Sequence, residues 1–148
     1  MCRKLETINI PSTLTRIKES TFSSCDSLKS IVIPGSVKTI EYYAFNCCFE
    51  LKSVKIENGV TTIESSAFYR CSKLDQIIIP NTVEEIGMGV FGMCDNLKKI
   101  YYYGTETEWE SINGNSLLSS QTKYYYKETE PDASGNFWHL VDGIITEW

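Results

Sequence analysis

The sequence predicts a solenoid, in which the chain winds into stacked coils of 23 residues with parallel strands on one side. Leucine recurs at this interval at five positions, Leu5, Leu28, Leu51, Leu74 and Leu97. Aliphatic residues move in the same frame, and phenylalanine closes four successive units, at Phe22, Phe45, Phe68 and Phe91. A period of about 20 to 29 residues with this apolar core marks one strand-bearing coil per repeat, and stacked coils bury a continuous core.

The second copy, residues 28–50, shows how one coil is built. Ile31 and Ile33 alternate with outward residues as in a strand, and Pro34 ends that strand because proline cannot donate to a ladder. Two further aliphatic residues return the chain to the core after a turn. Inward positions within residues 43–48 lie three or four apart, which predicts a short helix or turn on the opposite side of the coil.

The repeat frame divides the chain into four parts. Residues 1–4 are the expected tail of a truncated preceding repeat, because Cys2 keeps the frame. Residues 5–96 hold four regular repeats, residues 97–119 a degenerate fifth repeat, and residues 120–148 a degenerate sixth strand and a cap hairpin. Solenoids need a polar terminal cap, and nothing before the first repeat supplies one. We therefore expect the C-terminal piece of a longer protein, with any signal peptide absent from this fragment.

The C-terminal third is rich in aromatic residues. The tyrosine triplets 101–103 and 124–126 lie 23 residues apart, which predicts the sixth strand. Alternation along these strands points Tyr102 and Tyr125 inward and the other four rings outward.

The fifth coil and the cap follow the same frame. Trp109 falls one repeat after Ile86, so we expect its ring at a core position. Three aliphatic residues should fill the rest of this coil, Ile112, Leu117 and Leu118. Residues 135–148 are typical of a hairpin that turns at Asp142 and Gly143 and closes the last coil.

Five of the six cysteines share one position of the repeat, namely Cys2, Cys25, Cys48, Cys71 and Cys94. Only Cys47 is out of frame. Side chains stacked in parallel do not converge as a disulfide requires, so we expect unpaired thiols that serve as small buried apolar groups.

The pattern L-x-x-I-x-I-P-x-x-V-x-x-I-x-x-x-A-F-x-x-C is repeated closely over residues 5–96. It resembles the Treponema-type, or BspA-like, leucine-rich repeat family. Glu57 departs from the pattern at a proline position, and only the fourth copy keeps the usual Ile-Gly pair, at Ile86 and Gly87. The resemblance implies an α/β, right-handed leucine-rich-repeat solenoid with short helices or turns opposite the strands and an aromatic C-terminal cap. Residues 107–148 are similar to the C-terminal ends of such proteins.

Composition excludes several classes of partner. The 148 residues carry a net charge of −5, and residues 101–148 hold 2 basic and 8 acidic side chains. Because no basic stripe is present to neutralise phosphates, we expect no nucleic-acid partner. No stretch approaches the ~20 apolar residues of a membrane span, so we expect no membrane insertion.

Two surfaces are candidates for ligand binding. The strand row consists of the outward residues of successive strands: Thr7, Asn9, Ser30, Val32, Ser53, Lys55, Gln76, Ile78, Lys99 and Tyr101. Solenoids bind extended ligands on such faces. The second surface is the aromatic cap, including Tyr101 and Tyr103, whose rings either stack on a ligand or close the open end of the solenoid.

The predicted ligand-binding residues are accordingly Ser30, Val32, Ser53, Lys55, Gln76, Ile78, Lys99, Tyr101 and Tyr103. If the cap binds glycans, alanine at Tyr101 and Tyr103 abolishes carbohydrate binding without altering the fold.

Nothing in the sequence predicts an enzyme, a cofactor or a metal site. His139 is the only histidine and has no nucleophile placed for it by a recognisable motif. Metal binding lacks C-x-x-C pairs and a second histidine. Carboxylates such as Glu84 and Glu85, or Glu106, Glu108 and Glu110, are expected in exposed turns.

We therefore expect a non-enzymatic recognition module. The family resemblance implies a bacterial cell-surface or secreted protein that adheres through its solenoid face to host or bacterial proteins, including extracellular-matrix proteins. Two alternatives stay open. One is a glycan-binding module that uses the cap aromatics, and the other is a structural spacer that displays another domain and binds no ligand.

Overall fold

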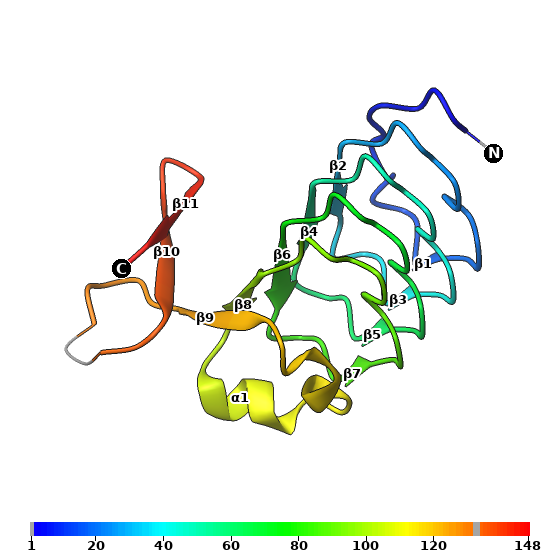
Figure 1. Ribbon diagram of the computed structural model, residues 1–148. Helices are drawn as coiled ribbons and strands as arrows, with labels where there is room; N and C mark the ends of the chain where they lie inside the picture. The colour runs from blue at the N-terminus through cyan, green and yellow to red at the C-terminus, as the bar shows by residue number, and fades with distance from the viewer. Residues whose placement is uncertain (1, 132–133) are drawn as a thin grey trace.

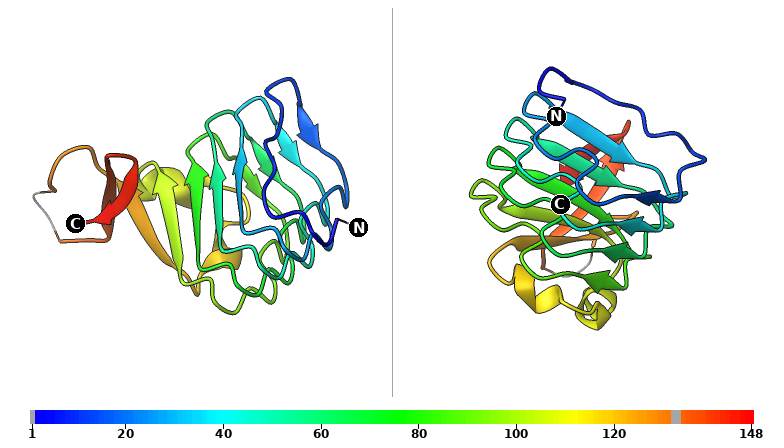
Figure 2. Two further views of the ribbon diagram at one scale, coloured as in Figure 1. Left: turned by 90° about the horizontal axis from the view of Figure 1, so that it is seen from above. Right: turned by 90° about the vertical axis from the view of Figure 1, so that its right-hand side faces the viewer.

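The chain forms a solenoid of stacked coils in the computed structural model (Figure 1). The structure describes residues 2–131 and 134–148. Met1, in the predicted repeat tail, and residues 132 and 133, in the predicted C-terminal segment, lie outside the described residues. Figure 2 shows the coils following one another along a single axis, with the C-terminal hairpin at the end away from the N-terminus. The solenoid predicted from the repeat period is confirmed.

A seven-stranded sheet forms one side of the solenoid. Its solenoid strands, all parallel, are β2 (Ser30–Ile33), β4 (Ser53–Ile56), β6 (Gln76–Pro80), β8 (Lys99–Tyr103) and β9 (Thr122–Tyr126). Ser30 lies opposite Ser53, and Ser53 opposite Gln76, so the pairing keeps the 23-residue frame. Equivalent repeat positions therefore form straight rows across the sheet. Residues 5–10 form no strand and are joined to β2's coil by a bond from the Lys29 N–H to the Glu6 carbonyl.

A second, narrower sheet runs along the solenoid. It consists of two-residue strands, β1 (Arg16–Ile17), β3 (Thr39–Ile40), β5 (Thr62–Ile63) and β7 (Glu85–Ile86), paired in parallel in this order. The isoleucine of each strand is buried. The apolar core lies between the two sheets and the turns that connect them.

The turns that close the regular coils contain no helix, because their backbone donors are divided between coils. The N–H groups of Phe45 and Cys47 donate to carbonyl oxygens of the next coil at 2.7 and 2.9 Å. Neighbouring residues donate to carbonyls three positions earlier in their own coil. Tyr43 and Cys47 also adopt left-handed φ angles of 55° and 58°, which interrupt helical geometry. Of the two predicted alternatives, short helices or turns, the regular coils contain turns.

Two ladders of side chains run through the core. Phe68 stacks between Phe45 and Phe91, with ring centroids 5.0 and 5.6 Å apart. Beside the rings, Cys48, Cys71 and Cys94 each donate a thiol hydrogen bond of 3.1–3.2 Å to a phenylalanine carbonyl of the preceding coil. All six cysteines are free, as predicted, although Cys2 at the end of the stack is exposed.

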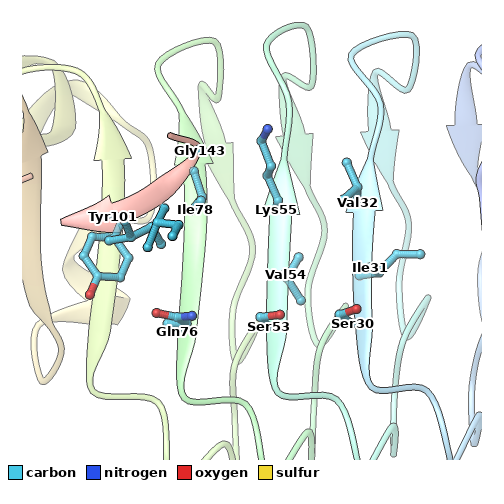
Figure 3. A pocket seen from close by; sticks show the side chains of 12 residues that line it. Ser30, Ile31, Val32, Ser53, Val54, Lys55, Gln76, Ile78, Tyr101 and Gly143 are labelled. Atoms are coloured by element: carbon cyan, nitrogen blue, oxygen red, sulfur yellow. The ribbon is translucent and has the colours of Figure 1, made fainter. Parts of the chain in front are cut away.

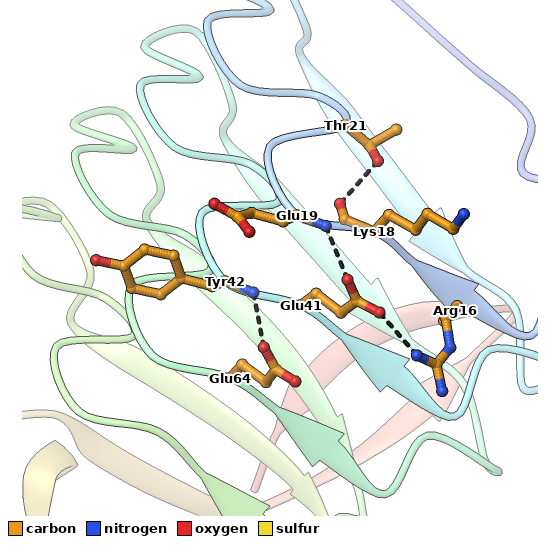
Figure 4. Close-up of polar contacts among 7 residues, drawn as sticks. All are labelled: Arg16, Lys18, Glu19, Thr21, Glu41, Tyr42 and Glu64. Atoms are coloured by element: carbon orange, nitrogen blue, oxygen red, sulfur yellow. Dashed lines mark hydrogen bonds and ion pairs between the residues drawn. The ribbon is translucent and has the colours of Figure 1, made fainter.

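Glutamates link consecutive coils along the second sheet (Figure 4). The Glu41 carboxylate accepts a 3.0 Å bond from the Glu19 N–H and pairs with Arg16 at 3.1 Å. Glu64 makes the equivalent bond one coil later, where it accepts a 2.9 Å hydrogen bond from the Tyr42 N–H. The next position is Gly87, where a Cβ atom would lie 2.2 Å from the Ser65 nitrogen. The fourth coil approaches too closely there for any side chain.

The fifth coil departs from the repeat. It contains α1 (Glu106–Ser111) and the 3₁₀ helix η1 (Asn115–Leu118). Trp109 is buried, as predicted, and packs edge-to-face on Tyr102 at 5.3 Å. It does so from α1, however, and Asn113 occupies the place beside Glu85 in the second sheet. The inserted helix shifts the frame of the repeat. The expectation that Trp109 occupies the repeat position that Ile86 has in the coil before was therefore wrong. Ile112 and Leu118 are buried as expected, whereas Leu117 is 49% exposed.

A hairpin of β10 (Phe137–Val141) and β11 (Ile144–Glu147) ends the chain. The connecting Asp142 and Gly143 both have positive φ, 51° and 80°, as a two-residue type I′ turn requires. β10 begins in parallel with β9, where Trp138 lies opposite Tyr126, and β11 then pairs antiparallel with β10. Beyond this short contact the hairpin leaves β9. Its residues 143–147 lie over the outer face of the seven-stranded sheet.

Candidate functional site

The part of the strand row on β2, β4, β6 and β8 forms the floor of a hollow of about 470 Å³ on the outer face of the large sheet, whereas Thr7, Asn9 and Lys99 do not line it. Seven of the nine predicted ligand-binding residues line this hollow: Ser30, Val32, Ser53, Lys55, Gln76, Ile78 and Tyr101. The 23-residue register brings them together because it stacks equivalent positions of β2, β4 and β6 side by side. Gly143, Ile144 and Ile145 of the hairpin supply a wall (Figure 3).

Two chemically different lines cross the floor. Ser30, Ser53 and Gln76 occupy one register row and present neutral hydrogen-bonding groups. The second row carries Val32, Lys55 and Ile78. Val32 is 49% exposed, which leaves apolar surface open to solvent next to the Lys55 ammonium. The floor can therefore bind polar and apolar groups in parallel lines.

Lys99, the eighth predicted residue, holds the hairpin in place. Its ammonium lies 2.7 Å from the Glu147 carboxylate, which also accepts a hydrogen bond from the Tyr101 hydroxyl. Partial burial disfavours the ionised carboxylate, but the bonds from Lys99 and Tyr101 outweigh burial and lower the pKa of Glu147. The same contact with Glu147 raises the pKa of Lys99. Both charges are thus stabilised at neutral pH, and they tie β11 to β8.

The cap aromatics form a small core of their own. The fully buried ring of Trp138 contacts Tyr101, Tyr103 and Tyr126 edge-to-face at 5.5, 4.7 and 5.3 Å. Tyr101 points outward, as alternation predicted, but the hairpin covers it and leaves it 3% exposed. Burial and the bond to Glu147 raise its pKa. Because the Tyr101 ring supports the cap, we now expect alanine at this position to disturb the fold, contrary to the expectation from the sequence.

Tyr103, the ninth predicted residue, lies outside the hollow. It is half-buried against Trp138 and borders a separate depression near Lys55 and Glu57. Sequence reasoning missed the hairpin wall, residues 143–145, although it predicted the turn. Nothing in the local pattern shows that a terminal hairpin folds back over the preceding strands.

The described residues provide no catalytic constellation. His139 stacks on Trp148 at 4.0 Å and belongs to the hairpin. Glu108 is occupied as the partner of Thr105 in the capping box of α1. Within residues 2–131 and 134–148, no three His, Cys, Asp or Glu side chains are grouped as metal ligands. No helix in the described parts of the chain is long and apolar enough to cross a membrane.

A family model decides what kind of protein this is. The model for the BspA type leucine-rich repeat region matches residues 1–121 in six copies. The chain belongs to the BspA type leucine-rich repeat family. The BspA type repeats make it a general scaffold for protein interaction. A comparison with curated proteins gave no match.

Solved structures share the BspA type solenoid. A leucine rich cell surface protein from Faecalibacterium prausnitzii is 30% identical with a TM-score of 0.58, over 70% of this chain and 34% of that chain. A leucine-rich repeat protein from Bacteroides ovatus is 27% identical with a TM-score of 0.62, over 76% and 28%. The Treponema pallidum leucine-rich repeat protein shows the same fold at 23% identity and a TM-score of 0.56, over 74% and 50%. The matched part thus spans between about a quarter and a half of each of these proteins.

Proposed function

We propose that this chain is a non-enzymatic protein-recognition module of a bacterial cell-surface or secreted protein. In this role the strand row binds a host or bacterial protein, such as an extracellular-matrix protein. The cell-surface assignment draws on the Faecalibacterium protein, which carries that description.

One observation carries the proposal. The residues that the repeat frame leaves outward converge on one hollow, which combines neutral polar groups, exposed apolar surface and the Lys55 cation. A face of this mixed character, continuous across three strands, suits a protein ligand, because specific protein interfaces combine apolar contact with hydrogen bonds. The Glu147 bonds hold the adjoining hairpin wall in a fixed position, which reduces the entropic cost of binding.

The glycan alternative has less support. Sugars stack on open aromatic faces, whereas Trp138 and Tyr101 are buried and Tyr103 faces Trp138. Tyr124 and Tyr126 also lie against other rings. The cap rings therefore stabilise the end of the solenoid.

The test is an array that carries extracellular-matrix proteins and glycans, probed with the purified chain and two variants. The row variant combines Ser53→Glu with Gln76→Arg. These positions are register partners, so the new charges can pair and spare the sheet. The control variant, Ser116→Glu with Ser119→Arg, makes the same charge changes at exposed positions in and after η1. Saturable protein binding lost only in the row variant supports the proposal. Glycan binding that survives in the row variant, or no binding at all, contradicts it.

A further inference from the structure

We propose that the free edge of β11 binds an extended polypeptide segment by strand addition, so that the segment lies in the hollow above β6, β4 and β2. The inference rests on the proposed function, because it states how the protein ligand is held. In this mode main-chain hydrogen bonds supply affinity, and alternate side chains of the segment meet the surface below.

One edge of β11 is unpaired. β11 pairs with β10 on one side, and no other strand within the described residues pairs with its second side. A strand edge of this kind presents a row of unsatisfied N–H and C=O groups that favours pairing with another strand. The edge is also accessible, since Glu147 near its end is exposed.

The alternation of hydrogen-bonded and non-bonded pairs between β10 and β11 identifies which backbone groups of β11 are free. The Trp148 N–H donates to the Phe137 carbonyl at 3.1 Å, which makes these two residues a hydrogen-bonded pair. In an antiparallel ladder such pairs alternate with non-bonded pairs. Ile145 and Glu147 therefore belong to the non-bonded set, and their backbone N–H and C=O groups point away from β10.

A hydrogen bond on the other side of β10 agrees with this assignment of bonded and non-bonded pairs. Trp138 lies opposite Glu147, and its carbonyl points away from β11, where it accepts a 2.9 Å bond from the Lys127 N–H. The inner residues of the hairpin thus turn their backbone groups outward on both sides. On the β10 side the Lys127 N–H uses the Trp138 carbonyl, and on the β11 side the groups of Ile145 and Glu147 face no strand in the described structure.

β11 also borders the hollow. Ile144 and Ile145 line it together with the strand row, and Figure 3 shows the strand that follows Gly143 crossing the direction of β6. Glu147 at the far end of β11 is bound to Lys99 and Tyr101 on β8, so a segment paired with β11 lies over β8 and β6. Continued past the turn at Gly143, the segment would run across β4 and β2. From Tyr101 on β8 to Val32 on β2 there are three strand spacings of about 4.8 Å, a span that about four extended residues cover.

The side chains that line the hollow define the chemistry of the segment. Lys55 is the only charged side chain among the described residues that line the hollow. It lies 3.9 Å from Glu57, and its side chain is 45% exposed, so its charge is open to a new partner. Val32 and Ile78 flank it in the same register row. The fitting segment therefore carries an acidic side chain opposite Lys55 with apolar side chains on the same face.

The test uses a phage-displayed library of random twelve-residue peptides selected on the intact chain. Counter-selection on the row variant removes peptides that bind other surfaces. Selected peptides are synthesised with single backbone N-methyl groups at successive positions, which removes one N–H at a time. Their dissociation constants are measured for the wild type, Lys55→Glu, Ile145→Pro and the matched control Ile145→Val, which keeps the N–H.

Strand addition predicts losses of about fivefold that alternate with every second N-methyl group, since each lost bond removes roughly 1 kcal/mol. It also predicts a similar loss of peptide affinity in Ile145→Pro and none in Ile145→Val. The selected peptides should share an acidic residue, and the contribution of this residue to affinity should disappear in Lys55→Glu. Uniform effects of N-methylation, or a selection that yields no peptide, overturn the inference. The N-methyl series does not depend on whether the proline variant keeps its hairpin.

The two proposals fail in different ways. A protein from the array that loses binding in the row variant but not in Ile145→Pro overturns strand addition and leaves the proposed function standing. A protein that binds both variants unchanged overturns the proposed function as well.

Discussion

The indole Nε1 of Trp138 donates a hydrogen bond to the carbonyl oxygen of Tyr102 at 3.1 Å, and this bond joins the C-terminal hairpin to β8. The donor is fully buried. A tryptophan N–H in that environment needs an acceptor, because an unpaired buried donor costs about 1 to 3 kcal/mol. The indole bond thus fixes the Trp138 ring among the tyrosines, while the Glu147 bonds to Lys99 and Tyr101 hold the other strand of the hairpin.

Trp138→Ala is expected to undock the hairpin. The substitution leaves a large cavity among the tyrosines and removes the bond to Tyr102, for an expected cost of about 3 to 5 kcal/mol. Amide hydrogen exchange in β10 and β11 is the measurement, because it reports local opening. Trp148→Ala is the control, since that ring is 43% exposed and should matter little. Equal exchange in both variants would contradict the role assigned to Trp138.

Glu147→Gln tests the electrostatic part of the same contact. Because the folded-state pKa of Glu147 is lowered, its contribution is fully present above the unfolded pKa of about 4.3 and is lost as pH falls through the folded value. At pH 7 the variant should open its hairpin about two- to fivefold more often than the wild type. The difference should shrink as pH falls through the folded pKa and vanish below it, because the wild-type carboxyl is then protonated.

Hydrogen exchange of the hairpin at pH 7 and at a series of lower pH values measures this effect. Glu57→Gln is the control, because Glu57 pairs loosely with Lys55 and does not contact the hairpin. A difference that persists unchanged at low pH would show that the charge of Glu147 is not what holds β11.

The regular coils were predictable because period and burial coincide. Each of the positions Leu28, Ile31 and Phe45 recurs at a fixed interval, and the parallel register makes the interval directly visible as stacking. The turn side was less certain, since spacings of three and four fit a helix as well as a turn. Sharing of N–H groups between coils, as at Phe45, decided for turns, and such sharing is a tertiary effect.

The helix in the fifth coil has a sequence signal of its own. Thr105 and Glu108 form a capping box, with the Thr105 hydroxyl bound by the Glu108 N–H at 3.2 Å. This T-x-x-E spacing predicts the start of a helix, and a helix there moves Trp109 off the strand frame. The sequence predicted the floor of the hollow but not its wall. Alternation placed Val32 and Ile78 outward, but the hairpin wall depends on the Trp138 contact, which no local pattern encodes.

Phe68→Ala tests the assignment of the core. The ring is fully buried between two others, so its removal should lower the free energy of unfolding by about 3 to 5 kcal/mol. Tyr69→Ala should cost under about 1 kcal/mol, because the half-buried Tyr69 ring lies on the outer side of the turn. Urea unfolding followed by far-ultraviolet circular dichroism compares the two. Equal costs would mean that the inward face has been misassigned.

Thiol reactivity tests the cysteine ladder. Burial raises the pKa of Cys25 to about 11, and thiol contacts with Cys48 and Cys94 together with burial raise that of Cys71. Because the thiolate is the reactive form, both should resist modification at pH 8, and solvent exclusion should protect Cys48 and Cys94 as well.

Titration of the native chain with Ellman's reagent should therefore show Cys2, which is exposed, reacting first and the half-buried Cys47 more slowly. The remaining four should react only after unfolding in guanidinium, which makes all six available. Fast reaction of Cys71 in the folded chain would contradict a closed core. A total below six after unfolding without a reductant would instead reveal a disulfide, which the parallel stacking of these side chains disfavours.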